Sequence, residues 1–231
     1  MRRDLAAQKF LAKQPAAQAA FALAARGDGI TLRAAANGNP TEILIYDEIG
    51  FWGITGKDFV KALADAGPGP VRVRINSPGG DVFDGMAIHN AIKQRGGVEV
   101  VIDGIAASAA SYIAIAGERV LIHEAAMMMV HKAWGLTIGN DEEHLETAVT
   151  LGKIDGQLAP LYAAKTGAEV EAMAALMAAE TWFTSDEALA AKLVDEVVKA
   201  EAPKARAAVS VNANADEIER RRRMLRLAEA A

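Results

Sequence analysis

The amino-acid sequence predicts an α/β fold with a mostly parallel β-sheet, and two observations lead to this prediction. Between Thr41 and about Ala200, short segments rich in β-branched residues alternate with longer segments of helical spacing. This order is typical of repeated βαβ units, whose strands run parallel. Hydrophobic residues make up 52% of the 231 residues and charged residues 24%, a balance that suits a soluble domain with a buried core.

The first half of the core contains two predicted strands and two predicted helices. Residues 41–46 (TEILIY) are rich in strand-forming residues and begin the sheet. Residues 55–66 have helical spacing, with Thr55 as the expected N-terminal cap. Residues 71–75 (VRVRI) alternate like a half-buried strand, and residues 84–94 have the apolar spacing of a second helix.

The second half continues the same alternation. Residues 98–102 (VEVVI) are the next strand, and the apolar residues 106–117 are expected to form a helix. Residues 119–122 and 127–130 are two further strands. Residues 141–166 are expected to form a long amphipathic helix, whose apolar stripe packs either on its own sheet or against another subunit. That stripe consists of Leu145, Ala148, Leu151, Ile154, Leu158 and Leu161.

Two segments flank the core domain of residues 41–200. Residues 1–40 are rich in Ala, Gln and Arg and end in strong turn signals, which predicts an N-terminal arm. Pro203 interrupts the chain after the core, and residues 201–231 are expected to form a linker and a short basic helix. The arginines at positions 220–223 either form a solvated helix face or contact an acidic partner.

Composition excludes several kinds of site and partner. The chain has no cysteine, which excludes disulfides, thiolate zinc sites and a cysteine nucleophile. Its net charge of −5 argues against nucleic acid as a partner. The chain has four histidines, which are few for a metal site built from several histidine ligands. The longest uncharged central stretch, residues 104–117, is shorter than the roughly 20 residues that a membrane-spanning helix needs.

Two junctions between a strand and the following helix carry the candidate chemistry, since α/β folds place their sites at the carboxyl ends of strands. The first is residues 76–81 (NSPGGD), where paired glycines leave backbone N–H groups free to bind an oxyanion. An ordinary tight turn is the alternative. The second is residues 103–112, where small residues around Ser108 allow a sharp turn into a helix. The positive end of the helix dipole would favour Ser108 as a nucleophile, although an N-cap has the same pattern.

A serine nucleophile needs a general base, and His131 is the best-placed histidine. It directly follows the predicted strand of residues 127–130, so it is expected to emerge at the edge of the sheet that carries the site. His89 and His144 lie within predicted helices, and His123 ends another strand. A structural role for His131 is the alternative.

Together these segments resemble the ClpP serine peptidase family over roughly residues 43–198. The matching segments are residues 75–80 (INSPGG), 104–108 (GIAAS), 129–131 (MVH), 182–188 (WFTSDEA) and 193–195 (LVD). The resemblance implies the ClpP/crotonase-like fold of repeated βαβ units, with residues 141–166 as a protruding handle helix. It also implies a homo-oligomer, in which this helix joins two rings of usually seven subunits.

The resemblance further implies a serine endopeptidase that cleaves polypeptides through an acyl-enzyme. Ser108 is then the nucleophile and His131 the general base, while the N–H groups of Gly80 and Ala109 form an oxyanion hole. Such acyl transfer requires no metal or organic cofactor. We therefore expect no cofactor, no nucleic acid and no membrane among the partners.

One position departs from the family's pattern. Where the family has its triad aspartate, this chain has Thr181, preceded by Glu180. Thr181 is able to accept a hydrogen bond from His131 but supplies no charge. Glu180 would point to the opposite face from Thr181 in a regular strand. The third position of the triad is therefore open between Thr181, its neighbour Glu180, and a Ser–His dyad without a third member.

Three segments are similar to a phage branch of the family, the head maturation proteases. They are residues 46–50 (YDEIG), 53–56 (GITG) and 180–184 (ETWFT). This similarity implies cleavage of scaffold and capsid proteins, in the host cytoplasm or inside a prohead. The terminal segments would then be pro-segments that the enzyme removes itself.

Four other hypotheses remain open at this point. An ATPase could feed the protease, as in Clp-type enzymes. A serine–lysine peptidase resembling signal peptide peptidase A would use Lys132 or Lys153 as the base, at a depressed pKa. A crotonase-like enzyme would use the oxyanion loops for acyl-CoA chemistry without a serine nucleophile. A non-catalytic assembly protein is the fourth.

Overall fold

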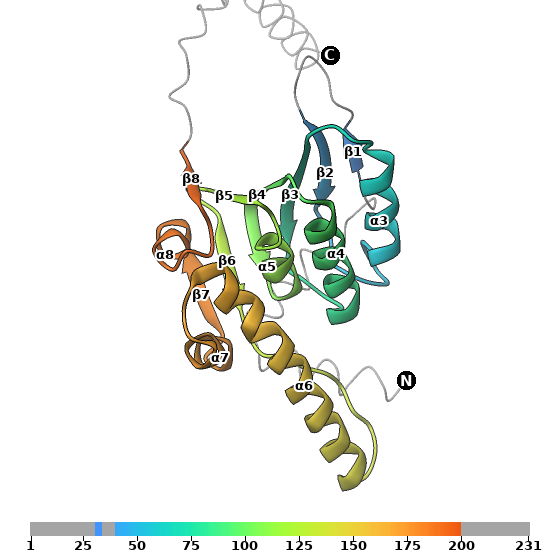
Figure 1. The fold of residues 1–231 in the computed structure, drawn as a ribbon. Helices are drawn as coiled ribbons and strands as arrows, with labels where there is room; N and C mark the ends of the chain where they lie inside the picture. Colours follow the sequence, from blue (N-terminus) through green and yellow to red (C-terminus); the bar gives the residue numbers. More distant parts are fainter. Residues whose placement is uncertain (1–30, 34–39, 200–231) are drawn as a thin grey trace, which may run out of the picture. The chain divides into compact units, whose positions relative to one another are not determined.

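The computed structural model confirms an α/β fold with a mostly parallel sheet (Figure 1). It describes residues 31–33 and 40–199. Most of the predicted arm and the predicted C-terminal helix lie outside the described residues. The described elements in chain order are β1 (Thr31–Arg33), β2 (Thr41–Ile45), α3 (Gly56–Asp65), β3 (Val71–Ser77), α4 (Val82–Arg95), β4 (Val98–Ala107), α5 (Ala109–Ala114), β5 (Arg119–His123), β6 (Met127–Val130), α6 (Asp141–Thr166), α7 (Val170–Ala178), β7 (Thr181–Thr184), α8 (Ser185–Ala190) and β8 (Glu196–Val198).

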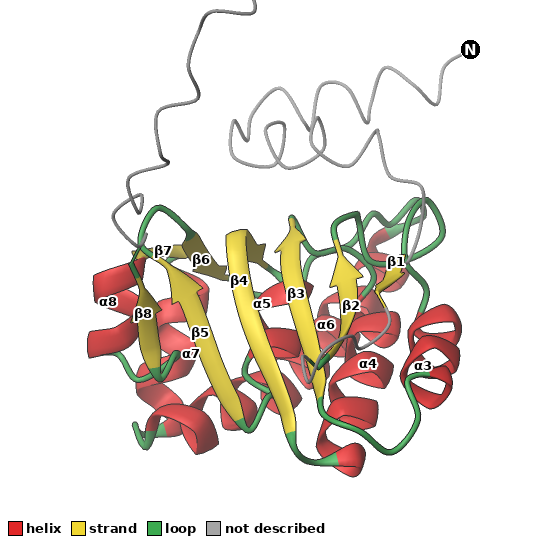
Figure 2. Cartoon of the chain, turned by 90° about the horizontal axis from the view of Figure 1, so that it is seen from above, coloured by secondary structure: helices red, strands yellow, loops and turns green. Residues whose placement is uncertain are grey.

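The sheet is built around parallel strands in the order β2, β3, β4, β5 and β8. At one edge β1 pairs antiparallel with β2, so a short part of the predicted arm belongs to the sheet. Side chains from every second residue of the central strands are buried, including Val73, Ile75, Val100 and Ile102. They pack against helices such as α3, α4 and α5, which lie behind the strands in Figure 2.

β4 changes partner along its length, and this change creates the site. Its first half pairs with β5, while Ile105–Ala107 pairs in parallel with Met127–Met129 of β6. β6 in turn pairs antiparallel with β7. The carboxyl ends of β4 and β6 are therefore adjacent, and so are the residues that follow them.

The predicted helix of residues 106–117 is wrong at both ends. Ala106 and Ala107 belong to β4, and the helix α5 runs only over Ala109–Ala114. Alanine favours helices, but pairing of Ala106 and Ala107 with β6 outweighs that local preference. The elements α7, β7, α8 and β8 follow the long helix, where the sequence patterns predicted no elements.

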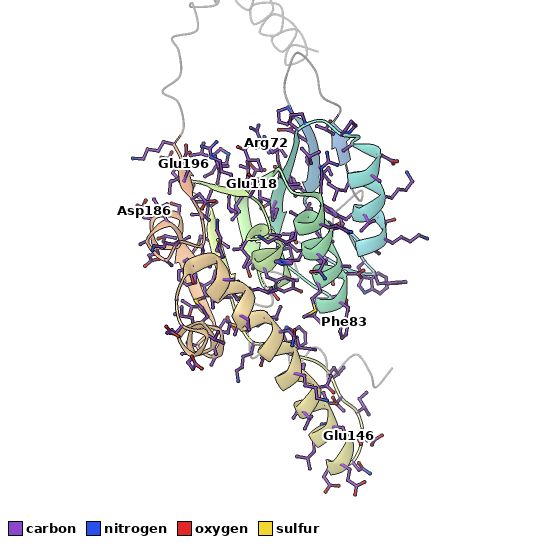
Figure 3. The ribbon with its side chains drawn as sticks, viewed as in Figure 1. Arg72, Phe83, Glu118, Glu146, Asp186 and Glu196 are labelled. Carbon is purple, nitrogen blue, oxygen red and sulfur yellow. The ribbon has the colours of Figure 1, made fainter. Side chains whose placement is uncertain are left out.

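The face of the sheet that the described helices leave uncovered carries a row of charged side chains. Arg72 pairs with Glu42 on one side and Glu99 on the other, and Arg119 bridges Glu99 and Glu196. Arg72 and Glu196 are labelled on this part of the molecule in Figure 3. Opposite charges on neighbouring strands stabilise the pairing, so this row supports the register of the sheet.

α6 begins at the predicted residue and has two distinct halves. Asn140 and Glu143 form a capping box at its N-terminus, since each side chain accepts a hydrogen bond from the other residue's backbone N–H. In the second half, Leu158 and Tyr162 are buried in the core. In the first half, Leu145 and Val149 are exposed, and this half extends away from the sheet in Figure 1. The apolar stripe therefore packs on its own domain only in its second half.

Candidate active site

Ser108 stands at a sharp turn between β4 and α5. Its backbone has φ 53° and ψ −123°, a conformation that L-residues rarely adopt. Although Ser108 occupies the N-cap position of α5, its side chain makes no capping hydrogen bond. The interpretation of Ser108 as an N-cap serine is therefore wrong, because its hydroxyl is directed elsewhere.

The Ser108 hydroxyl meets His131. His131 Nε2 lies 2.7 Å from Ser108 Oγ. The pairing of Ala107 with Met129 brings the two strand ends together, and the Ser108 N–H donates to the Met129 carbonyl at 3.0 Å. The imidazole is thus within proton-transfer distance of the serine.

Burial sets the protonation state of His131. Desolvation lowers the pKa of His131 below its usual value, and the carboxylates of Glu180 and Asp155 oppose this shift. Because the net effect is a lowered pKa, the imidazole is neutral at neutral pH. A neutral imidazole can accept the Ser108 proton, as a general base must.

The loop between β3 and α4 faces the Ser108 turn. Gly79 and Gly80 have φ of 93° and 146°, values that favour glycine. A β-carbon on Gly79 would lie 2.7 Å from Ser108 Cβ and 2.6 Å from the Ala107 carbonyl oxygen, so the two backbones are in close contact. Gly79 must therefore be glycine for the loop to approach the serine.

Two backbone N–H groups at this place have no protein acceptor. Within residues 31–33 and 40–199, neither Gly80 N–H nor Ala109 N–H donates a hydrogen bond. The neighbouring groups are occupied, since the Asp81 N–H bonds the Ile49 carbonyl at 2.7 Å and the Ile49 N–H bonds Gly79. Fixed donors that await an acceptor are the requirement of an oxyanion hole.

A cavity of about 420 Å³ opens beside these groups. Its lining includes Ser108, His131, Gly80 and Ala109. Its apolar wall comes from several elements, and its members include Val82, Phe83, Met129, Trp134, Leu151 and Leu158. An apolar wall next to the Ser108 hydroxyl and free N–H donors suits a ligand with an apolar group.

Thr181 does not lie where the third position of the triad would need it. Its hydroxyl donates to the Leu176 carbonyl at 2.7 Å. Within the part of the chain that the structure describes, no hydrogen bond joins Thr181 to His131. Glu180 precedes β7 rather than belonging to it, has φ 49°, and lines the cavity with Ser108 and His131.

The remaining histidines and the candidate lysines serve other contacts. His89 is buried, and its Nδ1 lies 2.7 Å from the Tyr112 carbonyl, as expected of a structural histidine. His123 lies 3.4 Å from Asp103. Lys132 lies 3.9 Å from Asp155 and, like Lys153, is exposed. Among the described residues no lysine bonds Ser108, so the geometry disfavours the serine–lysine hypothesis.

The sequence matches the family model described as Clp protease over residues 60–201. This range is more than half of the chain and contains Ser108, His131 and the glycine loop. The chain belongs to the Clp protease family. Membership agrees with the fold.

Curated relatives carry the same family name. The Clp-family chain is 32% identical over 128 residues to the ATP-dependent Clp protease proteolytic subunit of Pleurastrum terricola. It is 34% identical over 128 residues to proteolytic subunit 3 of Rhodococcus jostii. These matches cover 54% of the chain, and 65% and 63% of the two relatives. A Bacteroides fragilis proteolytic subunit is 29% identical over 133 residues, which are 55% of the chain and 63% of the relative. The chain therefore spans slightly less than two thirds of these relatives.

Behind Ser108 of this Clp-family chain lies a pair of hydroxyls that sequence reasoning missed. Ser111 Oγ donates to the Ser108 carbonyl at 2.6 Å, and it lies 2.6 Å from the hydroxyl of Tyr162 on α6. Only the apolar spacing of α6 and the small residues after Ser108 are visible in the sequence. Neither pattern indicates that these two side chains meet.

Two further properties of the described residues concern metal sites and membrane-spanning helices. Their histidines and carboxylates include no group of three or more arranged to hold a metal ion. None of their helices combines the length and the apolar character needed to cross a membrane.

Proposed function

We propose that this protein is a serine-type endopeptidase. The single observation that carries the proposal is the 2.7 Å contact between His131 Nε2 and Ser108 Oγ, at a turn with free N–H donors beside it. Membership of the Clp protease family and the names of its relatives support the same activity.

The proposed reaction proceeds in two acyl-transfer steps. His131 Nε2 takes the Ser108 proton while Ser108 Oγ attacks the peptide carbonyl carbon. The carbonyl oxygen becomes an oxyanion that accepts hydrogen bonds from Gly80 N–H and Ala109 N–H. The imidazolium then protonates the leaving amine, and the C–N bond breaks to give an acyl-enzyme. Water, deprotonated by His131, hydrolyses the ester and restores Ser108.

The proposed substrates are polypeptides, and the branch of the family we propose is that of phage prohead proteases. The segments YDEIG, GITG and ETWFT support this assignment, since they resemble that branch. Scaffold and capsid proteins would then be the substrates, in the host cytoplasm or inside a prohead. The second candidate is a protease fed by an ATPase, which the names of the ATP-dependent relatives favour.

We further propose that the protein acts as a homo-oligomer of rings, with seven subunits in each. The exposed apolar side chains near the start of α6 support this proposal, because an isolated domain would leave them in water. They are Trp134, Leu136, Ile138, Leu145 and Val149. Contacts through this part of α6 would join two rings face to face.

Four measurements test these possibilities. Hydrolysis of unfolded casein by the wild type, absent in Ser108→Ala, is the result expected of a serine endopeptidase. Cleavage of co-expressed phage scaffold protein without nucleotide would favour the prohead branch. Stimulation by a Clp ATPase and ATP would favour the second candidate. Intact mass over time tests removal of the terminal segments, and unchanged termini in an active enzyme would contradict self-cleavage.

A further inference from the structure

The pairing of β6 with β7 places Glu180 next to His131. The antiparallel register pairs Met129 with Trp182 and Val130 with Thr181. His131 directly follows β6 and Glu180 directly precedes β7, so the two residues flank the last pair of this register. Directly opposite residues on antiparallel strands project to the same face, so Thr181 shares the face of Val130.

The backbone at Glu180 departs from the strand at this step. Its φ of 49° is a left-handed conformation in a residue other than glycine. Its N–H donates to Met177 at the end of α7, which holds the turn in place. Both Glu180 and His131 line the cavity beside Ser108. Such strained backbone is costly, by about 1 kcal/mol or more, and is found disproportionately at functional sites.

His131 lacks a partner on its second nitrogen. Its Nε2 contacts Ser108, and within residues 31–33 and 40–199 no hydrogen bond is made by Nδ1. The triad mechanism needs a carboxylate near Nδ1 to orient the ring and to stabilise the imidazolium. Thr181 supplies no charge, and its hydroxyl is bonded to Leu176.

Several charged groups face His131, and they are not equivalent. The charge of Glu180 raises the His131 pKa more than the charge of Asp155 on α6 does. The Asp155 carboxylate already accepts from the Ala133 N–H at 2.8 Å and lies 3.9 Å from Lys132. Glu48 and Asp81 lie elsewhere on the cavity wall.

We propose that Glu180 is the positioning residue of the site: its carboxylate stabilises the His131 imidazolium through its charge, in place of the aspartate that Thr181 replaces. This inference rests on the proposed serine-peptidase function. During acyl transfer the proton stays on the imidazole, moving from Ser108 Oγ to His131 Nε2 and then to the leaving amine. Glu180 acts through its charge.

The test measures the His131 pKa directly and the pH dependence of hydrolysis in parallel. The pKa comes from hydrogen exchange at the imidazole C2, read by mass spectrometry on the full-length oligomer, and needs no catalytic activity. The variants are Glu180→Gln, Glu180→Asp and Asp155→Asn. Glu171→Gln on α7 is the matched control, since it removes the same charge from an exposed residue outside the cavity lining.

Removal of the Glu180 charge should lower the pKa of His131. The acid limb of the pH profile of kcat/KM then moves to lower pH. The plateau of kcat/KM falls about tenfold because kcat falls. A factor of ten corresponds to one pKa unit of charge stabilisation. Glu180→Asp should keep the wild-type limb, and Glu171→Gln should match the wild type. A merely structural role of Glu180 would lower activity or stability without moving the His131 pKa.

The outcomes separate this inference from the proposed function. An unchanged His131 pKa in Glu180→Gln overturns the role of Glu180, and so does a larger shift in Asp155→Asn. A shifted His131 pKa with no hydrolysis by the wild type would uphold the Glu180–His131 coupling and contradict the proposed function instead.

Discussion

The hydroxyl of Tyr162 donates a hydrogen bond to Ser111, and this contact links helix α6 to the turn at Ser108. Ser111 Oγ uses its single proton on the Ser108 carbonyl, so the proton in the 2.6 Å contact must come from Tyr162. Both side chains are buried, with Ser111 0% and Tyr162 1% exposed. Helix α6 therefore supports the strained backbone of Ser108 through two successive hydrogen bonds.

Loss of the two hydrogen bonds that run from Tyr162 through Ser111 to the Ser108 carbonyl should destabilise the protein and slow acylation. Ser111→Ala leaves the buried Tyr162 hydroxyl and one acceptor site of the Ser108 carbonyl unpaired, which costs about 1–3 kcal/mol of the free energy of unfolding. Tyr162→Phe should cost less, because it leaves the Ser111–Ser108 bond intact. The double variant should cost less than the sum of the two. Urea unfolding measures all three, and strict additivity would contradict the link.

Gly79→Ala should abolish most activity. The new methyl would lie within 2.7 Å of Ala107, Ser108 and Ala109 atoms, at a residue with φ 93°. The loop would have to move away from Ser108 together with the Gly80 N–H. Loss of one oxyanion donor lowers kcat by about 100-fold or more. Kinetics with a small ester substrate measures this loss.

Gly69→Ala is the matched control for this substitution. A β-carbon at Gly69 has no atom within 4 Å, and its φ lies outside the left-handed region. We expect wild-type kinetics and thermal stability for Gly69→Ala. Equal activity of the two glycine variants would contradict the close approach of residue 79 to the serine.

The buried His89 should make the protein less stable in acid. Burial lowers the pKa of His89 in the folded state, against the hydrogen bond to Tyr112. The unfolded chain therefore binds more protons near this pKa, and stability falls as pH drops from about 6.5 towards the lower folded value. His89→Asn keeps a donor for the Tyr112 carbonyl and should flatten this slope in Tm against pH. If the slope of Tm against pH is unchanged in His89→Asn, the loss of stability in acid comes from His131 and the carboxylates instead.

Arg74 should matter more to stability than an exposed lysine in a similar ion pair. Arg74 bonds both oxygens of Asp103, which is 13% exposed, and it also pairs with Glu42. Arg74→Met leaves the Asp103 carboxylate facing Tyr46 and His123, at an expected cost of about 1–2 kcal/mol. Lys61→Met breaks the exposed pair with Asp65 and should leave Tm unchanged. Similar Tm values for the two variants would contradict the argument.

Local signals in the sequence predict the elements that are determined locally. The start of α6 follows from Asn140 and Glu143, which cap the helix from within four residues. The candidate pair Ser108 and His131 is predicted because each follows a strand of the same sheet. The roles of both residues stay predictions until the chemistry is measured.

The features that the sequence does not predict depend on contacts between distant segments. Ala106 and Ala107 become strand because β6 pairs beside them, and Ala106 also pairs with Ser77 of β3. Ser111 and Tyr162 are 51 residues apart and meet through the packing of α5 on α6. The position of Glu180 relative to His131 depends on the register of β6 and β7, which no local pattern fixes.

Labelling with a fluorophosphonate probe tests the central claim most directly, since the probe reacts only with an activated serine. Peptide mapping of the labelled wild type should give one adduct, at Ser108. Ser108→Ala should give none, and His131→Ala should react at least about 100-fold more slowly, since general-base catalysis contributes a factor of that order. No adduct on the folded, assembled wild type, or equal labelling of His131→Ala, would contradict an activated Ser108–His131 pair.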